Sequence, residues 1–472
     1  MSQHNITCTC FFLIFYSYRK IEKLERNNDK EGERTRIYKA ASASHRVAPL
    51  SAGNVPTSSI HYEPQRPDLP PPSNCFHPLC KTVDGTLKGG INQEGINFYN
   101  NLINELLKNG IEPFVGIMHF DYPLALKQKH GGFLNRSIVK YYKDYSELLF
   151  KTHGDRVKHW TTINEAEFTA IVQYMFNIDN ISSDQTCINT KICTKTYTLV
   201  HNFLRVHAIT SKLYTTKFQA IQRGEIGLVI SSGRYVPYSS NPEDVVVAQR
   251  LMDFYWGWIL DLVFHGDYPR IMKELVGIRL PKFTKKEKHM LKGSTNFIGI
   301  NYYTSHFVRH ESNRTKIMAD NYDALAVSED SNAEGKILGF KDQYGWSNVY
   351  SEGLYNFLIY IKEKYKNPKV YITENGIASS KISNPLKDEH RIAYVAAHLN
   401  VTKTAINSLC KNAKYNTCTF YGCAFLLQVW GWWRVPTLAP ASNDLYMFPY
   451  ATEFYVKGMD YSKNLRRNIV LY

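Results

Sequence analysis

The sequence predicts an α/β protein in which parallel strands alternate with helices and close into a barrel. Short apolar runs rich in β-branched and aromatic residues are separated by longer stretches with helical spacing of apolar residues, and this alternation is typical of a parallel sheet built from βα units. In addition, Glu165 and Glu374 each come where such an apolar run ends. Because parallel strands present their carboxyl ends at the same edge, a closed sheet would bring these distant carboxylates together.

Length and composition fit one large barrel domain and equally two smaller domains. The chain has 472 residues, of which 44% are hydrophobic and 14% aromatic. Lys and Arg exceed Asp and Glu by 57 − 42 = 15, which raises the question of nucleic acid. The basic residues are spread along the chain without zinc-finger, RRM or basic-zipper spacing, so we expect a basic surface and no nucleic-acid partner.

The cysteines do not indicate a metal site. Nine cysteines are dispersed along the chain, and no CxxC pair is present, so we expect no bound metal. Cys187 and Cys193 lie close together in a polar stretch. The sequence leaves open whether this pair forms a disulfide or remains as free thiols.

Residues 1–84 are predicted to be irregular and to precede the barrel domain, residues 85–472. The run from Arg19 to Arg36 is densely charged, and the stretch from Ser51 to Cys80 is rich in Pro, Ser and His without apolar periodicity. The apolar run from Cys8 to Tyr18 is too short to span a bilayer and lacks the flanks of a signal peptide. We therefore expect no membrane partner, while localisation and oligomeric state stay open.

The strands are predicted from short apolar runs that end at turn residues. In the run that ends at Glu374, the apolar residues are followed by Asn375-Gly376, a strong turn signal. Six such strands are visible, whereas a closed barrel needs eight, and the deficit falls in the N-terminal segment. The predicted strands are 114–120, 160–163, 226–231, 297–302, 370–373 and 419–427.

The helices are predicted from apolar residues that recur every three or four positions. The first begins near Phe98, and Gly110 ends it in the manner of a helix C-terminal glycine. The others are predicted near 138–152, 197–220, 245–264, 353–365 and 390–409.

A pair of carboxylates at one edge of a barrel suits the hydrolysis of a sugar acetal. One acid protonates the leaving oxygen, and a second carboxylate supports or attacks the anomeric carbon; in retaining enzymes the two groups lie about 5 to 5.5 Å apart. A single Glu at a strand end is more often an ordinary surface residue. It is the matched placement of Glu165 and Glu374 that favours chemistry.

The motifs around these residues resemble family 1 glycoside hydrolases, the plant β-glucosidases in particular. WTTINE ends at Glu165 and YITENG contains Glu374. The resemblance extends from about Gly85 to about Trp433 and includes HFDYPLAL, GGFLNR, GDYPRIM, RLPKFT and FIGINYYTS in the family's order. It implies a (β/α)8 barrel, incomplete at its first two strands, that hydrolyses small β-glycosides with retention and needs no cofactor.

The resemblance also assigns roles to single residues. Glu165 corresponds to the acid/base and Glu374 to the nucleophile, while Asn164 corresponds to the residue that holds the sugar 2-hydroxyl. His119 corresponds to a ligand of another sugar hydroxyl, although a His on an apolar strand is more often a core residue.

Four further residues are assigned to the binding site in the same way. Asn301 and Tyr303 match residues beside the nucleophile, where a phenol can keep Glu374 ionised. Trp346 matches the aromatic wall of the aglycone site, and Trp432 matches a tryptophan of the sugar site. Each of these residue types also serves as ordinary packing in a barrel.

Three departures from the family pattern bear on activity. A faint match to the first strand, YKAASASHRV, places Arg46 where the family has a sugar-binding Gln, and Ala166 replaces the proline after the acid/base. Near the C-terminus, Phe425 replaces a Trp and Gly431 replaces a sugar-binding Glu, a loss of about 1.5 to 3 kcal/mol in hydrogen bonding. The alternative to an impaired β-glucosidase is therefore a non-catalytic relative that binds glycosides or a partner.

Overall fold

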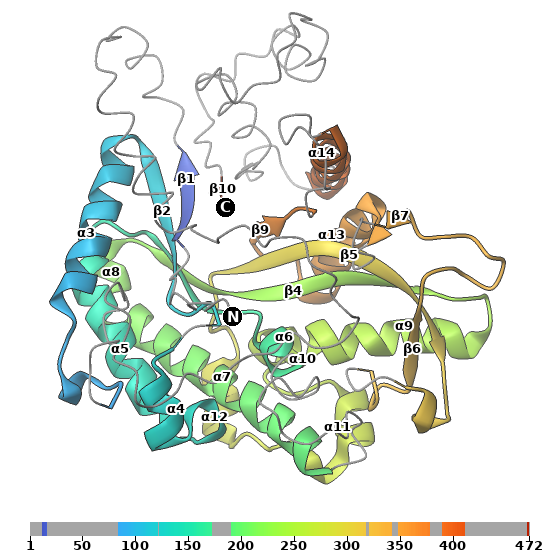
Figure 1. Ribbon diagram of the computed structural model, residues 1–472, viewed down its shortest axis with the longest axis horizontal. Helices are drawn as coiled ribbons and strands as arrows, with labels where there is room; N and C mark the ends of the chain where they lie inside the picture. Colours follow the sequence, from blue (N-terminus) through green and yellow to red (C-terminus); the bar gives the residue numbers. More distant parts are fainter. Residues whose placement is uncertain are drawn as a thin grey trace, which may run out of the picture.

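A curved sheet of parallel strands forms the centre of the molecule (Figure 1). The computed structural model describes residues 12–16, 84–120, 122–171, 190–317, 321–341, 348–377, 389–410 and 470–471. Within these residues the parallel strands pair in the order β2 (Ile111–Gly116), β3 (His159–Asn164), β4 (Glu225–Pro237), β5 (Phe297–His310) and β9 (Val370–Asn375). The predicted parallel α/β arrangement is confirmed.

The edges of the sheet differ from the parallel centre. Strand β1 (Phe12–Tyr16) pairs antiparallel with both β2 and β10 (Val470–Leu471). Strand β6 (Ala326–Glu329) pairs antiparallel with the far end of β5. Over the described residues the sheet does not close into a complete barrel. The expected strands at 38–47 and 419–427 lie outside the described residues, and the domain boundary after residue 84 stays a prediction.

Aromatic contacts across the sheet show how strongly it curves. In a flat sheet β2 and β9, which are four strand steps apart, would be separated by about 19 Å. The rings of Phe114 on β2 and Tyr371 on β9 instead have their centroids 5.4 Å apart. Phe297 on β5 packs against both, with centroid distances of 5.2 and 4.9 Å. The strands therefore follow a barrel's curvature, and aromatic side chains fill its interior near their amino ends.

Helices follow the strands as the sequence predicts. In Figure 1, α5, α7 and α9 lie along one side of the sheet, while α13 and α14 lie near β5 and β9. No helix within the described ranges is both long and apolar enough to cross a bilayer. The helices are α3 (Gln93–Lys108), α4 (Leu124–His130), α5 (Ile138–His153), α6 (Ala166–Ala170), α7 (Thr190–Lys217), α8 (Gln219–Gln222), α9 (Pro242–Met252), α10 (Trp258–His265), α11 (Arg270–Val276), α12 (Lys285–Leu291), α13 (Ser351–Tyr365) and α14 (Glu389–Cys410).

Several boundaries differ from the predicted ones. The helix expected over 245–264 is interrupted by a π-helical turn, Asp253–Gly257, between α9 and α10. Strands β4 and β5 extend well beyond 231 and 302, because they continue to pair with each other up to Pro237 and Val308. Strand β2 ends earlier than expected, so the segment 117–120, including His119, follows the strand as a loop.

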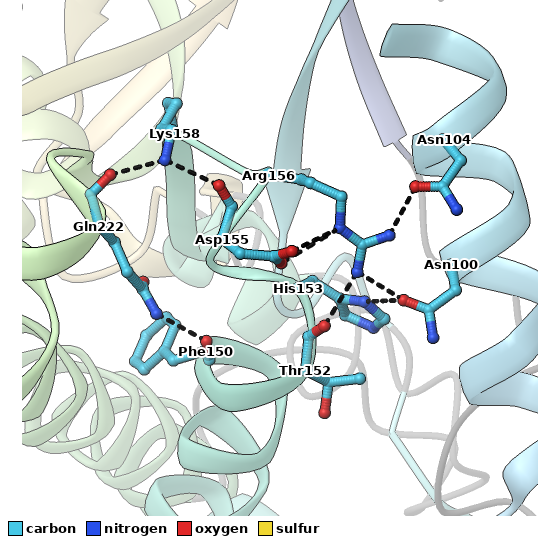
Figure 2. Close-up of polar contacts among 9 residues, drawn as sticks. All are labelled: Asn100, Asn104, Phe150, Thr152, His153, Asp155, Arg156, Lys158 and Gln222. Carbon is cyan, nitrogen blue, oxygen red and sulfur yellow. Dashed lines mark hydrogen bonds and ion pairs between the residues drawn. The ribbon is translucent and has the colours of Figure 1, made fainter. Parts of the chain in front are cut away.

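Polar side chains fix the amino end of β3 (Figure 2). Arg156 donates to Asn104 and Asn100 of α3, at 2.7 Å each, and to the carbonyl of Thr152 at 3.0 Å. Lys158 donates to the carbonyl of Gln222 at 2.7 Å. These bonds connect α3, α5 and α8 to the loop that enters β3. They lie at the amino ends of the strands, which in barrels contribute to stability, whereas active sites lie at the carboxyl ends.

Replacing Arg156 by Met is expected to lower the free energy of unfolding by about 1 to 3 kcal/mol, because several charged hydrogen bonds to a side chain that is only 23% exposed are lost. Urea unfolding followed by circular dichroism measures this change. Arg270→Met is the matched control, since that side chain is 90% exposed and, among the described residues, forms a surface pair with Glu274; it should change the value by less than about 0.5 kcal/mol. Equal effects of the two changes would contradict a role of this cluster in stability.

Candidate active site

Glu165 occupies the turn that follows β3. Its backbone is in the left-handed region, with φ 45° and ψ 59°, and α6 starts at the next residue. The N–H of Glu165 donates to the carbonyl of Val229 on β4 at 2.9 Å, and its own carbonyl accepts from the N–H of Thr169 at 2.9 Å. A strand, one left-handed residue and a short helix thus hold this side chain, which is only 5% exposed, at the carboxyl end of the sheet.

The pairing of the strands shifts by one residue beside each functional side chain. On β3 the register shifts between Thr161 and Asn164, just before Glu165. On β9, Ile372 and Glu374 are paired with consecutive residues of β5, so Thr373 is an additional residue. Strict alternation would place Glu374 on the face opposite Tyr371, which points into the barrel. Such bulges redirect side chains and are frequent next to active sites.

Asn301 connects the residues of the two carboxylate motifs. Its side chain is fully buried on β5, and its amide nitrogen donates to Glu165 Oε1 at 2.7 Å and to Asn164 Oδ1 at 3.1 Å. Its amide oxygen accepts from the hydroxyl of Thr373 at 2.6 Å, which fixes the orientation of the amide. In the strand pairing Asn301 lies directly opposite Glu374. Residues of both motifs therefore lie beside Asn301.

Tyr303 and His119 complete the surroundings of Glu374. The hydroxyl of Tyr303 donates to Glu374 Oε2, and His119 Nε2 lies 4.0 Å from Glu374 Oε1. The same His119 nitrogen lies 3.2 Å from the amide nitrogen of Asn164. An amide nitrogen can only donate, so this imidazole nitrogen accepts and the ring is neutral. Burial, which lowers the pKa of His119 to about 4, agrees with the neutral form.

The two carboxyl groups have different electrostatic surroundings. Burial and the nearby charge of Glu374 raise the pKa of Glu165 to about 8, against the opposing hydrogen bond from Asn301. Burial also raises the pKa of Glu374, but hydrogen bonds from Tyr303 and Asn301 both oppose the increase. Near neutral pH Glu165 is therefore the protonated acid, whereas the donors around Glu374 favour the ionised form of that group.

Thr373, Glu167, Phe120 and Phe168 lie beside these residues although the sequence does not predict them. Thr373 and Glu167 are buried polar residues next to the carboxylates. Their closeness in the sequence to Glu374 and Glu165 is the feature that could have indicated them. Phe120 and Phe168 are each 42% exposed and have ring centroids 6.1 Å apart. The ring of Phe120 also contacts His119 edge-on at 4.8 Å, which places an apolar rim beside the polar cluster.

Some predicted features lie outside the described residues. These are the two tryptophans assigned to substrate binding, Trp346 and Trp432, the departures at Arg46, Phe425 and Gly431, and Cys187, whose possible disulfide partner Cys193 belongs to α7. Their roles stay predictions. Ala166, the remaining departure, is described and is buried in the first turn of α6. Over the described ranges no group of three or more His, Cys, Asp or Glu side chains is placed to hold a metal ion.

Comparison with known proteins identifies the family. The model of glycosyl hydrolase family 1 matches residues 83–421, and the chain belongs to this family. It is 44% identical to a furostanol glycoside 26-O-β-glucosidase of Hellenia speciosa over 68% of this chain and 58% of the relative. It is 40% identical to β-glucosidase 17 of Arabidopsis thaliana, over 68% of this chain and 64% of that protein.

Solved structures give the same assignment. A rice β-glucosidase aligns with a TM-score of 0.63 and 34% identity, over 70% of each chain. A family 1 β-glucosidase from the fungus Humicola insolens, in complex with glucose, aligns with a TM-score of 0.65 and 29% identity over 69% of this chain and 70% of that one. The predicted family and (β/α)8 fold class are confirmed. The chain spans about six-tenths of the length of the two curated relatives above.

Replacing Glu374 by Gln is expected to lower the pKa of Glu165 from about 8 toward the ordinary value, because one of the two causes of its increase is removed while burial remains. An infrared titration of the carboxyl band, with Glu165→Gln used to assign that band, measures the midpoint. Glu243→Gln, which removes an exposed carboxylate on α9, should leave it unchanged. An unchanged midpoint in Glu374→Gln would show that the two carboxyl groups do not share one site.

Proposed function

We propose that the protein is a retaining β-glycosidase of the β-glucosidase type that acts on small β-glycosides. The observation that carries the proposal is the arrangement of Glu165 and Glu374 around the buried amide of Asn301, with one group kept protonated and the other supplied with hydrogen-bond donors. Acetal hydrolysis with retention needs this combination of an acid and a nucleophile. The named activities of the relatives support it.

In the first step the Glu374 carboxylate attacks the anomeric carbon, and the bond from that carbon to the glycosidic oxygen breaks. Glu165 transfers its proton to the departing oxygen, so the aglycone leaves as a neutral alcohol or phenol. The products of this step are a glycosyl ester on Glu374 and an ionised Glu165. Tyr303 holds the attacking carboxylate in position until the ester forms.

In the second step water replaces the aglycone. The ester on Glu374 carries no charge, so the like-charge repulsion that helped to raise the pKa of Glu165 disappears. Glu165 then acts as the base: it takes a proton from water while the water oxygen attacks the anomeric carbon and releases Glu374. Both carboxyl groups return to their starting protonation, and the sugar keeps its configuration.

The remaining side chains support recognition of the sugar and of its aglycone. Asn164 and His119 present polar atoms beside the carboxylates, as expected for ligands of sugar hydroxyls. Phe120 and Phe168 form an exposed apolar rim, which suits a flat or bulky apolar aglycone. We therefore expect aryl and other apolar β-glucosides to be preferred over short alkyl ones.

Replacing each carboxylate should affect substrates differently. Glu374→Gln should lower kcat/KM by about a thousandfold or more for both 4-nitrophenyl and methyl β-glucoside, because the nucleophile is lost with either. Glu165→Gln should lower it by about 100- to 10,000-fold for the methyl glycoside and far less for the nitrophenyl one, whose leaving group needs no proton.

The exposed Glu243→Gln variant is the control for these measurements and should retain full activity. Equal rates for Glu374→Gln and the unmodified protein would refute the mechanism. Binding of a β-glucoside by the unmodified protein without any turnover would instead identify a non-catalytic relative.

Phe168→Ala tests the aglycone rim. Loss of the ring should raise KM for the nitrophenyl glucoside by about tenfold, in line with about 1 to 2 kcal/mol of lost apolar contact, and should leave KM for the methyl glucoside nearly unchanged. Phe340→Ala, at another exposed ring on β7 (Phe340–Lys341), is the control. Equal KM increases for both substrates would contradict the placement of the aglycone.

A further inference from the structure

A third carboxyl group is buried beside the acid/base. Glu167 lies two residues beyond Glu165, in the first turn of α6, and is only 1% exposed. Its Oε1 accepts a hydrogen bond from the backbone N–H of Ser231 on β4 at 2.6 Å. Its Oε2 is buried without a hydrogen-bond partner among the described residues. The mechanism above does not use this group, although burial of a carboxyl group costs free energy that hydrogen bonds offset only in part.

The pairing of β3 with β4 explains why Ser231 needs this acceptor. The last pair of the two strands is Asn164 with Val229, and the carbonyl of Val229 faces β3, where it accepts from Glu165. Alternate residues of a strand point their backbone groups to the same neighbour, so the N–H of Ser231 also faces this side. There β3 has already turned away, and a buried N–H without a partner would be unfavourable. Glu167 supplies the missing acceptor.

The same stretch of β4 also supports Asn301. Ser231 is paired with Asn301 of β5, and the hydroxyl of Ser232 donates to the Asn301 carbonyl at 2.8 Å. The amide of Asn301 in turn donates to Glu165 Oε1. One short segment of β4 therefore supports Glu165 in two ways. Glu167 connects the backbone turn to this segment directly, and Asn301 connects the carboxyl group to it indirectly.

We propose that Glu167 is a positioning residue whose carboxyl group, bound to the Ser231 N–H, holds the left-handed turn that aims Glu165 at the substrate. The inference rests on the proposed glycosidase function. Ala166, which stands between the two glutamates, has no ring to restrict the turn. The restraint on the turn therefore comes from hydrogen bonds to β4: from the Glu165 N–H to Val229, and from Ser231 to Glu167.

The hydrogen bond from Ser231 requires an acceptor and not a charge. Burial raises the pKa of Glu167 well above its ordinary range, although backbone hydrogen bonds, including the one from the Ser231 N–H, oppose the increase. A Gln side chain has the same shape and the same acceptor oxygen, whereas Leu has a similar volume and no acceptor. The pair Glu167→Gln and Glu167→Leu therefore separates positioning from simple filling of space.

The test compares kcat/KM for methyl and 4-nitrophenyl β-glucosides. Glu167→Gln should stay within about threefold of the unmodified protein on both. Glu167→Leu should lower the value for the methyl glucoside by about 10- to 100-fold, as expected for a displaced proton donor, and that for the nitrophenyl glucoside by less than about threefold. Glu243→Leu, in the first turn of α9, is the control for an apolar substitution on a helix and should change neither value.

A purely structural role would lower the yield of folded protein or both activities together, and would not change the ratio between the two substrates. Equal losses on both substrates in Glu167→Leu would therefore overturn the proposal. A large loss on the methyl glucoside in Glu167→Gln would overturn it as well, because the charge or the proton of Glu167 would then be what matters.

A second readout does not depend on turnover, so it remains informative if the proposed function fails. In the infrared titration of Glu165, Glu167→Gln should leave the midpoint unchanged, and Glu167→Leu should lower it, because a released turn exposes the Glu165 carboxyl to water. An unchanged midpoint in both variants, or a decrease in both, would overturn positioning by Glu167. Absence of hydrolysis by the unmodified protein, with the midpoints as expected, would count against the glycosidase function alone.

Discussion

The hydrogen bond from the Asn301 amide to Glu165 is the interaction on which the site depends. Asn301 lies on β5, which pairs with β4 on one side and with β9 on the other, so this residue adjoins the strands that support both carboxylates. Thr373 fixes the direction of the amide, and the amide then fixes the acid/base. Because Asn301 is fully buried, the geometry does not rely on any mobile surface group.

The amino ends of the strands contribute to stability, and the carboxyl ends carry the functional side chains. Near the amino ends of the strands, Phe114, Phe297 and Tyr371 pack together and impose the curvature, while the cluster around Arg156 fixes the approach to β3. Near the carboxyl ends the strands pair irregularly, and those irregularities fall at the functional side chains. This division lets the packed end stabilise the strands while the other end tolerates bulges, a left-handed residue and buried carboxyl groups.

The sequence predicts much of this structure, and the parts it does not predict share a cause. The apolar runs that end at Glu165 and Glu374 locate two strands and both carboxylates, because composition and turn residues act locally. The extension of β4 and β5 is not predicted, since it depends on their mutual pairing over polar residues such as Ser232 and Arg234. Nor does alternation predict that Glu374 faces the site, because the additional residue at Thr373 appears only in the register with β5.

The raised pKa of Glu165 has a consequence for the whole molecule beyond its reaction. An unfolded chain gives up this proton near pH 4.5, whereas the folded protein keeps it until about pH 8. Within that interval this group binds more protons in the native state than in the unfolded state, so its own contribution to the free energy of unfolding decreases as the pH rises. The contribution of this proton donor to stability is therefore lost in mildly alkaline surroundings, and a chain that exchanged the acid for an amide would avoid that loss at the expense of its chemistry.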